Sequence, residues 1–344
     1  MFKLRLIPIL LSVGVTHASM GQVVTSCPDR RVYTSNEDFE EGMLVNLNLG
    51  VSGQLQVNKV ASTFPFIWVA ASARGTIIKI NTETGEVLGE YLSAPNGLGR
   101  NPSRTTVDQD GAVWAGNRDE AGGGKGSVVQ IALFESGDCQ DRNGNGVIDT
   151  STGLGDIRPW PNPGGVDSDG GVASAEDECI TKYLRVEGDY IRHVSVDNSN
   201  NVWVAGNFGN DNTFELIDNQ TGAILASFDV GAGGYGGLVD SNGVLWSSNR
   251  GPGPFTVLRY DTKNTVATED DTFSLIESPN PYGLAVDGMG NVWNSEFTNN
   301  SIRKWNAAGQ LFPGFPVGTG GASGDRGTAV TPIDNNVWIA NSGA

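Results

Sequence analysis

Residues 285–293 read Ala-Val-Asp-Gly-Met-Gly-Asn-Val-Trp, and other segments of the chain repeat this pattern. In each copy an apolar stretch ends in Asp, a short turn with Gly or Asn follows, and Val-Trp or Leu-Trp begins a second apolar stretch. Such a turn between two apolar stretches is typical of a β-hairpin. The other full copies are residues 106–114, 195–203 and 238–246, and weaker copies end at Trp68 and Trp338.

The tryptophans that end these copies are regularly spaced along the chain. They stand at positions 68, 114, 203, 246, 293 and 338, so successive intervals are 46, 89, 43, 47 and 45 residues. The interval of 89 contains two cysteines and a long Gly/Asp/Pro-rich stretch, and removing an insertion of about 45 residues restores one ordinary repeat. Six tryptophans then mark six units.

A second hairpin follows the first in each unit. Residues 76–88 form an alternating stretch, an Asn-Thr-Glu-Thr-Gly turn and another alternating stretch, and residues 214–225 and 301–311 repeat this order. Four short strands in 43 to 47 residues are typical of one blade of a β-propeller. The sequence therefore predicts an all-β fold, a single six-bladed β-propeller.

The last unit ends after its second strand, at residues 341–344. Residues 44–48 and 54–57, which flank a turn through Gly53, follow the pattern of the second hairpin. We expect these amino-terminal strands to complete the sixth blade and close the ring, because closure removes exposed sheet edges. The alternative is that the chain is a fragment of a longer repeat array.

The amino terminus has the order of features found in a secretory signal peptide. Lys3 and Arg5 precede an apolar run at residues 6–15, which is too short to span a bilayer, and small residues follow. Cleavage after Ala18 or Gly21 fits a signal peptidase, and the mature protein is expected to be secreted or periplasmic. The expected organisation is a signal peptide at 1–21, an extension at 22–42, the propeller at 43–344 and an insertion at 135–180 within the second blade.

The chain has three cysteines. In an oxidising compartment Cys139 and Cys179 are the natural disulfide pair, which would clip the insertion and leave Cys27 odd. Lipid attachment at Cys27 is a weaker alternative, since this residue lies well beyond the apolar run.

Composition excludes some classes of partner. With 22 Lys and Arg against 39 Asp and Glu, the formal charge is −17, which repels a nucleic-acid backbone. No segment approaches the 18 apolar residues of a membrane span, so a soluble protein is expected. Expected partners are instead a polar small molecule, a glycan or a cell-surface protein.

The blade motifs resemble those of known propellers. The Asp-x-x-Gly-x-Val-Trp turn followed by an Ile-x-Ile-Asx-x-x-Thr-Gly hairpin is similar to the blades of NHL-type propellers and of virginiamycin B (streptogramin) lyases. The resemblance covers residues 43–344 apart from the insertion. Because propellers of this kind include lyases, lactonases and pure binding modules, it implies the fold and leaves the activity open.

Equivalent positions of the blades identify a candidate site on the central channel. Residues four or five before each repeated Asp, and those three or four after each Trp, are expected to cluster near the axis. They are mostly polar, as a site for a polar or anionic ligand requires, although the amides alternatively hold turns and the arginines pair with nearby acids. The candidate residues are Arg104, Asn117, Arg118, Arg192, Asn207, Tyr235, Asn249, Arg250, Tyr282, Arg326 and Asn341.

The resemblance to streptogramin lyases also implies a catalytic set: a channel-facing Glu, two histidines and a divalent metal. Glu296 matches the Glu of a Trp-x-x-Glu motif, and His193 is the single histidine left after signal cleavage. Tyr282 stands where the resemblance leads us to look for a histidine, so the set is incomplete. His193 suits a general base by its ordinary pKa, but a lone histidine is more often structural.

A second enzymatic alternative comes from six-bladed lactonases, whose tunnel holds a calcium ion. Glu296 with Asn117, Asn249 and Asn341 falls at equivalent blade positions and offers the oxygen ligands of a hard cation. A channel metal is therefore an alternative to an empty binding surface.

The insertion carries the sharper metal motif. Residues 141–149 fit the start of an EF-hand calcium loop, with Gly146 at the bend and Thr152 where a bidentate Glu is expected. Either Asp156 or the acidic run at 176–178 can replace that Glu, and the alternative is an Asx-rich turn that binds nothing. The expected calcium ligands are Asp141, Asn143, Asn145, the carbonyl of Val147, Asp149 and Asp156.

The favoured function is a secreted, non-catalytic recognition module that binds a polar ligand, a glycan or a surface protein. The alternative is a metal-assisted lyase or lactonase acting near Glu296 and His193. An enzyme requires these two side chains to converge on a common space, whereas a binding module does not.

Overall fold

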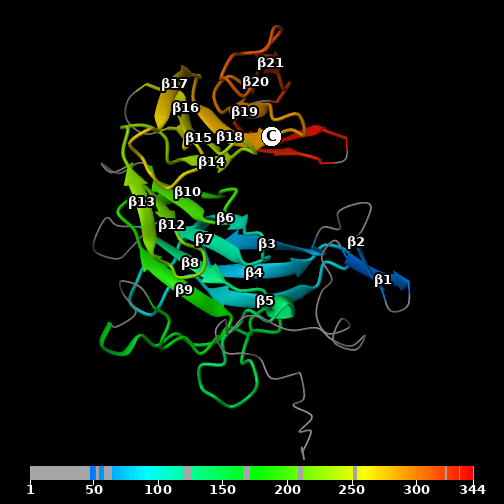
Figure 1. Cartoon of the computed structure of the whole chain (residues 1–344), viewed down its shortest axis with the longest axis vertical. Helices are drawn as coiled ribbons and strands as arrows, with labels where there is room; N and C mark the ends of the chain where they lie inside the picture. Colours follow the sequence, from blue (N-terminus) through cyan, green and yellow to red (C-terminus); the bar gives the residue numbers. More distant parts are fainter. Residues whose placement is uncertain are drawn as a thin grey trace, which may run out of the picture. The chain divides into compact units, whose positions relative to one another are not determined.

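The computed structural model describes residues 47–51, 54–57, 64–118, 126–165, 171–207, 212–250, 254–321, 324–332 and 334–343. The chain divides into two compact units, residues 1–61 and 62–344. In the first unit, β1 (Leu47–Val51) and β2 (Gln54–Val57) form an antiparallel hairpin of their own (Figure 1). The predicted signal peptide, the extension and Cys27 lie outside the described residues.

The second unit consists of antiparallel sheets that follow one another in chain order (Figure 1). Four sheets have four strands each, connected in the order of the sequence, as the paired hairpins predict. Their strands are β6 (Pro102–Val107), β7 (Val113–Asn117), β8 (Ser127–Ile131) and β9 (Ile180–Arg185); β10 (Ile191–Val196), β11 (Val202–Gly206), β12 (Phe214–Ile217) and β13 (Ile224–Phe228); β14 (Gly236–Val239), β15 (Val244–Asn249), β16 (Thr256–Asp261) and β17 (Thr272–Glu277); and β18 (Pro281–Val286), β19 (Val292–Glu296), β20 (Ser301–Trp305) and β21 (Val317–Gly318).

The first and last sheets of this unit are smaller. The first contains β3 (Phe66–Ala71), β4 (Thr76–Asn81) and β5 (Val87–Leu92), and the last contains β22 (Asp325–Val330) and β23 (Val337–Asn341). Trp338 of β23 is 63% exposed, whereas the equivalent Trp246 is fully buried. Among the described residues, β23 therefore lacks the cover that the complete sheets give to this tryptophan.

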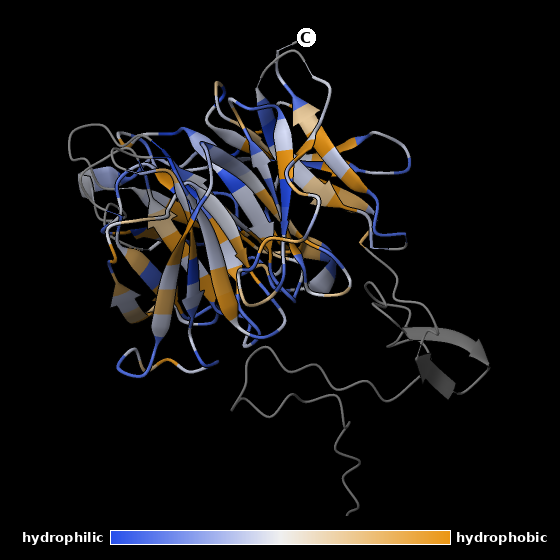
Figure 2. Cartoon of the chain, turned by 90° about the horizontal axis from the view of Figure 1, so that it is seen from above, coloured by the Kyte–Doolittle hydropathy of each residue, from blue (hydrophilic) through white to orange (hydrophobic). Residues whose placement is uncertain are grey.

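The cores lie between consecutive sheets. Trp114 packs with Ile191 and Val204 of the next sheet, and Trp203 packs with Leu245 and Leu258 of the sheet after that. Strand β15 contributes buried apolar residues to the next interface in the same way. Figure 2 shows apolar residues recurring along the strands. The repeats that contain Trp114, Trp203 and Trp246 thus bury this tryptophan in a core shared with a neighbouring repeat, as propeller blades do.

The repeated Asp holds the turn between the first two strands of a sheet. The Oδ1 atom of Asp240 accepts the N–H groups of Asn242 (2.8 Å) and Val244 (3.1 Å), and Oδ2 accepts the indole N–H of Trp246 at 3.0 Å. The same three bonds recur at Asp108 and Asp287. The motif is therefore a hydrogen-bonded turn that also orients the buried tryptophan.

Replacing Asp240 by alanine is expected to lower the free energy of unfolding by about 2 kcal/mol, because three donors lose their acceptor in a buried turn. Urea unfolding measures the loss. Glu269→Ala, at an exposed position, is the control and should change stability by less than about 0.5 kcal/mol. Equal effects of the two substitutions would contradict the role of the Asp side chain.

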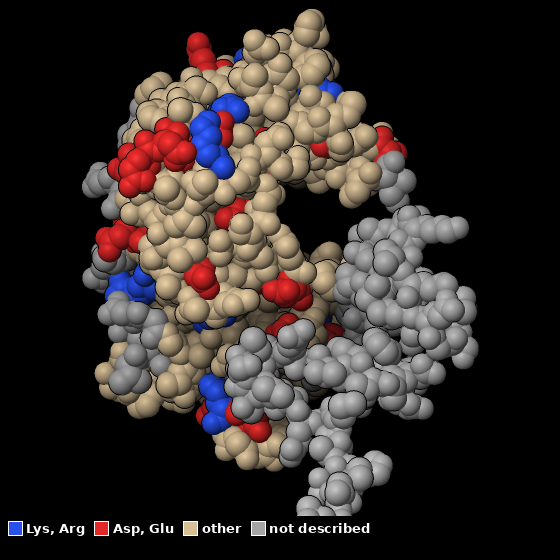
Figure 3. Space-filling model, viewed as in Figure 1, with Lys and Arg blue, Asp and Glu red and all other residues tan. Residues whose placement is uncertain are grey.

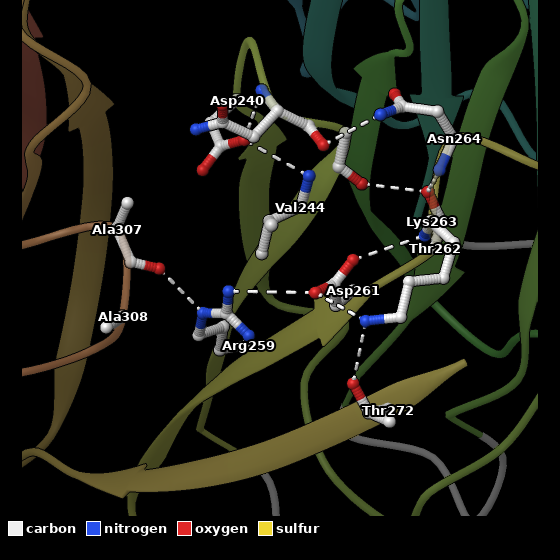
Figure 4. A network of polar contacts seen from close by, with 12 residues as sticks. Asp240, Val244, Arg259, Asp261, Thr262, Lys263, Asn264, Thr272, Ala307 and Ala308 are labelled. Carbon is white, nitrogen blue, oxygen red and sulfur yellow. Dashed lines mark hydrogen bonds and ion pairs between the residues drawn. The ribbon is translucent and has the colours of Figure 1, made fainter. Parts of the chain in front are cut away.

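Asparagines connect the turns of neighbouring sheets. Asn264 (Figure 4) has a positive φ of 56°. It donates to the Asn242 carbonyl at 2.9 Å and accepts a hydrogen bond from Asn198 at 3.0 Å. Asn200 joins the turn at Asp110 in the same way, with its amide 2.9 Å from Oδ2. These contacts fix the spacing between sheets at the hairpin turns.

The described residues between β8 and β9, at 132–165 and 171–179, are mostly irregular, with short 3₁₀ turns η2 (Phe134–Ser136) and η3 (Pro163–Gly165). The predicted disulfide between Cys139 and Cys179 is confirmed. In the described part of the chain, no helix has the length and apolarity that crossing a bilayer requires.

The insertion also contacts the first sheet through Glu90 of β5. The Glu90 N–H donates to Ser151 Oγ at 2.8 Å, and its Oε2 accepts the Gly155 N–H at 2.9 Å. Further along, the Asn96 N–H donates to the carbonyl of Trp160, whose ring is fully buried edge-on against Tyr183. The insertion between β8 and β9 thus attaches the sheet that contains these strands to the preceding sheet, β3–β5.

Candidate functional site

The first strands of successive sheets lie beside one another and bring their leading residues together. Contacts join β6 to β10, β10 to β14, β14 to β18, and β18 to β22. Arg104, Arg192, Tyr282 and Arg326 stand near the start of their strands, and Tyr235 immediately precedes β14. The strand starts therefore gather cationic and aromatic side chains.

Arg250 lies at the centre of this group. Its Cζ atom is 4.9 Å from the ring centroid of Tyr235, 4.6 Å from that of Tyr282 and 4.7 Å from that of Phe297. Arg104 and Arg326 also lie over these rings, at 5.0 to 5.5 Å. Such cation–π contacts hold guanidinium groups close together despite their like charge. We call Arg104, Arg192, Tyr235, Arg250, Tyr282, Phe297 and Arg326 the arginine–tyrosine cluster.

The two tyrosine hydroxyls connect the arginines. Arg192 donates to the Tyr235 hydroxyl at 3.3 Å, and Arg326 donates to the Tyr282 hydroxyl at 3.1 Å. Burial opposes ionisation of Tyr282, but hydrogen bonds from Tyr235 and Arg326 and the charge of Arg104 outweigh it and lower the pKa of this phenol. Burial and its hydrogen bond to Tyr282 raise the pKa of Tyr235.

Three arginines of the cluster have neutral partners in the described part of the chain. Within the described ranges, the polar contacts of Arg104, Arg250 and Arg326 are to tyrosine hydroxyls and an Asn280 amide oxygen, and none is to a carboxylate. Burial, then repulsion from Arg192, lowers the pKa of Arg104, although tyrosine contacts oppose this. Arginine remains protonated under such perturbation.

A cavity of about 130 Å³ lies against the cluster. Arg104, Arg192 and Tyr282 line it, together with several glycines of the first strands, two threonines, Val194 and Leu284. A Cβ atom built on Gly236 would meet the Arg104 guanidinium carbon at 3.6 Å, an ordinary contact distance. Gly236 therefore leaves space in front of Arg104, whereas a Cβ atom on the equivalent Gly283 would lie only 2.4 Å from the Arg326 carbonyl oxygen.

The structure places the other candidate arginine, Arg118, beside Asn101, whose amide oxygen accepts a hydrogen bond from its guanidinium. Burial lowers the pKa of Arg118, and the positive charges of Arg192 and Arg104 add to this effect. Arg118 therefore lies close enough to the cluster for the charges of Arg192 and Arg104 to affect its pKa.

The candidate asparagines are used inside the fold. The Asn117 amide donates to the Ser93 carbonyl at 2.8 Å, Asn207 donates to the Gly233 carbonyl at 2.7 Å, and Asn341 donates to Asp325 at 2.9 Å. Asn249 donates to the Pro254 carbonyl at 3.1 Å. These amides stand at or just after the ends of second strands and bind other parts of the fold.

Glu296 is fully buried and has its own cation. Its carboxylate accepts hydrogen bonds from the Arg303 guanidinium and the Ser301 hydroxyl, both on the adjacent strand β20. The negative charge of Glu296 is therefore paired with Arg303, whereas a catalytic or metal-binding carboxylate would face the substrate or the metal.

His193 is enclosed in the core. Its ring nitrogens lie 3.0 Å from the Ser247 hydroxyl and 2.8 Å from the Ser195 hydroxyl, and its ring meets Phe214 edge-on. Burial, with a smaller effect of the Arg104 charge, lowers the pKa of His193 to about 3. His193 and Glu296 share no contact in the described part of the chain, and they do not form a joint acid–base site.

The pKa of His193 predicts an acid-sensitive stability. Because the folded-state pKa lies below the ordinary value of 6.5, the unfolded chain binds the proton first, and stability falls as pH drops from 6.5 toward 3. Between pH 7.5 and pH 5 the expected loss is about 2 kcal/mol. His193→Gln should abolish this part of the loss in chemical unfolding at the two pH values. The same loss of unfolding free energy between the two pH values in both proteins would refute this role of His193.

The insertion forms a tight loop around Asp141. The N–H groups of Gly144 and Gly146 each donate to an Asp141 carboxylate oxygen at 2.8 Å, and the Asn143 and Asn145 amides approach Asp149 Oδ2 at 2.9 and 3.0 Å. Gly146 has a φ of 82°, as the predicted bend requires. In the described residues no group of three His, Cys, Asp or Glu side chains is arranged for a metal. A cation here would depend on amide and carbonyl oxygens as well.

Glu178 approaches this loop from the disulfide. Its carboxylate accepts the N–H groups of Arg142 (2.8 Å), Asn143 (3.1 Å) and Asp149 (2.8 Å), because the Cys139–Cys179 bond holds it there. Asp156 instead accepts hydrogen bonds from Thr152. Of the two replacements considered for the missing bidentate Glu, the acidic run is the one that meets the loop.

Comparison with known proteins supports the architecture. No family model and no curated protein sequence matches the chain. Among solved structures, virginiamycin B lyase from Staphylococcus aureus is similar, with a TM-score of 0.51, 17% identity, and coverage of 81% of this chain and 75% of the lyase. A catalytically inactive variant of that lyase with quinupristin has a TM-score of 0.50 and 14% identity over 91% of this chain and 81% of the other.

A functionally unknown protein from Desulfotomaculum acetoxidans is similar too, with a TM-score of 0.52 and 11% identity over 81% of this chain and 73% of that protein. At these identities the similarity concerns the fold alone. The chain has a streptogramin lyase-like β-propeller fold, as the blade motifs predict.

Proposed function

We propose that the protein is an exported, non-catalytic recognition module whose binding surface is the arginine–tyrosine cluster. The observation that carries this proposal is the gathering of Arg104, Arg250 and Arg326, which contact aromatic rings and neutral polar groups and have no carboxylate partner in the described residues. The chain as a whole is strongly acidic, with a formal charge of −17, so this local excess of positive charge runs against its composition. Polar ligands, such as glycans or acidic groups on the surface of another protein, fit this positively charged cluster.

A binding role is favoured over catalysis because the candidate catalytic groups are already engaged. Glu296 is paired with Arg303, and His193 is buried and neutral at physiological pH. Neither lies in the cluster.

The test is binding to an array of neutral and acidic saccharides by the wild type and by Arg250→Ala/Tyr282→Ala. The proposal expects binding that the double variant loses and that Lys263→Gln, a surface charge change elsewhere, retains (Figure 4). Mass spectrometry of the recovered ligand should find it unchanged. Binding that survives the double substitution, or a released product, would overturn the proposal.

We further propose that calcium binds the loop at residues 141–149 and stabilises the insertion. Asp141 and Asp149 would supply carboxylates, and Asn143, Asn145 and the Val147 carbonyl would supply neutral oxygens, a donor set suited to a hard cation. Metal analysis and thermal melts with calcium or chelator test this. Calcium should raise the Tm of the wild type but not of Asp141→Ala. An unchanged Tm in the wild type would exclude it.

Closure of the last blade by the amino-terminal strands is also a proposal. It is supported by the match of residues 44–57 to the second-hairpin pattern and by the exposed Trp338. Removal of residues 1–61 should then lower the Tm and increase quenching of tryptophan fluorescence by iodide. Unchanged quenching would count against closure.

A further inference from the structure

The cavity beside the arginine–tyrosine cluster is small and polar. At about 130 Å³ it has room for a few water molecules, far less than a site that encloses a whole drug-sized ligand. What enters it is therefore a single chemical group at the end of a larger ligand.

Residues that carry hydrogen-bond donors line this cavity. They include Arg104 and Arg192, with Thr105 and Thr328. Among the described residues, no Asp or Glu lines the cavity. Guanidinium groups bind oxyanions through short, charge-assisted hydrogen bonds, and they fit the planar carboxylate and the tetrahedral sulfate or phosphate.

The surroundings preorganise these donors. The tyrosine rings under Arg104 and Arg192 hold the guanidinium carbons at 5.5 and 5.0 Å from the Tyr235 centroid. Arg326 and Arg250 are fixed nearby by Tyr282 and Asn280. Ligand binding then requires little ordering of long side chains, which would otherwise weaken affinity.

We propose that this cavity binds one oxyanion group of the ligand, a carboxylate or a sulfate. The inference rests on the proposed recognition function and narrows it to acidic ligands. Neutral sugars or peptides without an acidic group lack the charge that the arginines require.

Isothermal titration with defined small probes tests the proposal. Glucuronate and inorganic sulfate are the two anion arms, and glucose at the same concentration is the neutral control for glucuronate. At least one of the two anions should bind. If glucuronate binds, the affinity for glucose should be lower by about tenfold or more. Binding of glucuronate alone identifies a carboxylate ligand, and binding of sulfate identifies recognition by charge.

Two variants locate the binding. Arg104→Gln removes one guanidinium and should weaken the anion about tenfold or more. Gly236→Ala places a methyl group beside the Arg104 guanidinium without a clash and should also weaken it, whereas Gly318→Ala, in open surroundings, should not. The alanine variants keep the test valid if Arg104→Gln fails to fold.

The proposal is overturned if neither anion binds, if glucose binds as well as glucuronate, or if both cavity variants bind as the wild type does. Saccharide-array binding that depends on Arg250 and Tyr282 while neither anion binds would leave the recognition function standing and remove only the oxyanion assignment.

Discussion

Replacing Glu90 by alanine is expected to lower the free energy of unfolding by about 3 kcal/mol. Glu90 is fully buried, and its carboxylate accepts two hydrogen bonds from Arg74, at 2.7 and 2.8 Å, one from Thr76 at 2.7 Å and one from Gly155 at 2.9 Å. Burial opposes its ionisation, but these bonds outweigh that effect and lower the pKa of Glu90. Alanine at position 90 removes the carboxylate that accepts all of these hydrogen bonds.

Urea unfolding gives the magnitude, and Glu83→Ala on the same hairpin, at an exposed position, provides the matched control. Glu90→Gln keeps the volume and part of the hydrogen bonding, so its loss should be smaller. Since Gly155 belongs to the insertion, Glu90→Ala should also speed limited proteolysis between residues 141 and 165. If the Glu90→Ala and Glu83→Ala variants were equally stable, the hydrogen bonds of the Glu90 carboxylate would not contribute to stability as predicted.

Removing the disulfide with Cys139→Ser/Cys179→Ser is expected to cost about 4 kcal/mol, because the bond closes a loop between cysteines 40 residues apart. The same bond holds Glu178 over the loop at Asp141, so the double variant should lose any calcium-dependent rise in Tm as well.

Chemical unfolding of the double variant and of the wild type with and without reductant measures the effect. Reduced wild type should match the variant, which controls for the serine substitutions. A difference below about 1 kcal/mol would show that the insertion holds itself together without the bond.

The repeat fold was predictable because its chemistry is local. Asp240 and Trp246 belong to one hairpin, and the hydrogen bonds that join them lie within seven residues of sequence. The disulfide was predictable because only two cysteines flank the insertion. Equivalent blade positions also identified Arg104, Tyr235 and Tyr282, since the first strands of neighbouring sheets lie side by side.

Contacts between distant segments were not predictable in this way. Glu90 and Gly155 are 65 residues apart, and nothing in either local pattern indicates the hydrogen bond between them. The amide of Asn117 and the carboxylate of Glu296 occupy channel-type positions, but their partners, Ser93 and Arg303, decide whether they face a ligand. Phe297 was missed because its role depends on stacking against Tyr282 from another strand.

The disulfide has a consequence for how damage to this protein would be seen. The bond ties the two ends of the insertion directly beside β8 and β9, which are themselves hydrogen bonded along their length. A protease that cuts once between residues 140 and 178 would therefore leave two polypeptides that stay covalently joined and folded. Such nicked molecules would migrate as intact protein until a reducing agent separates the pieces.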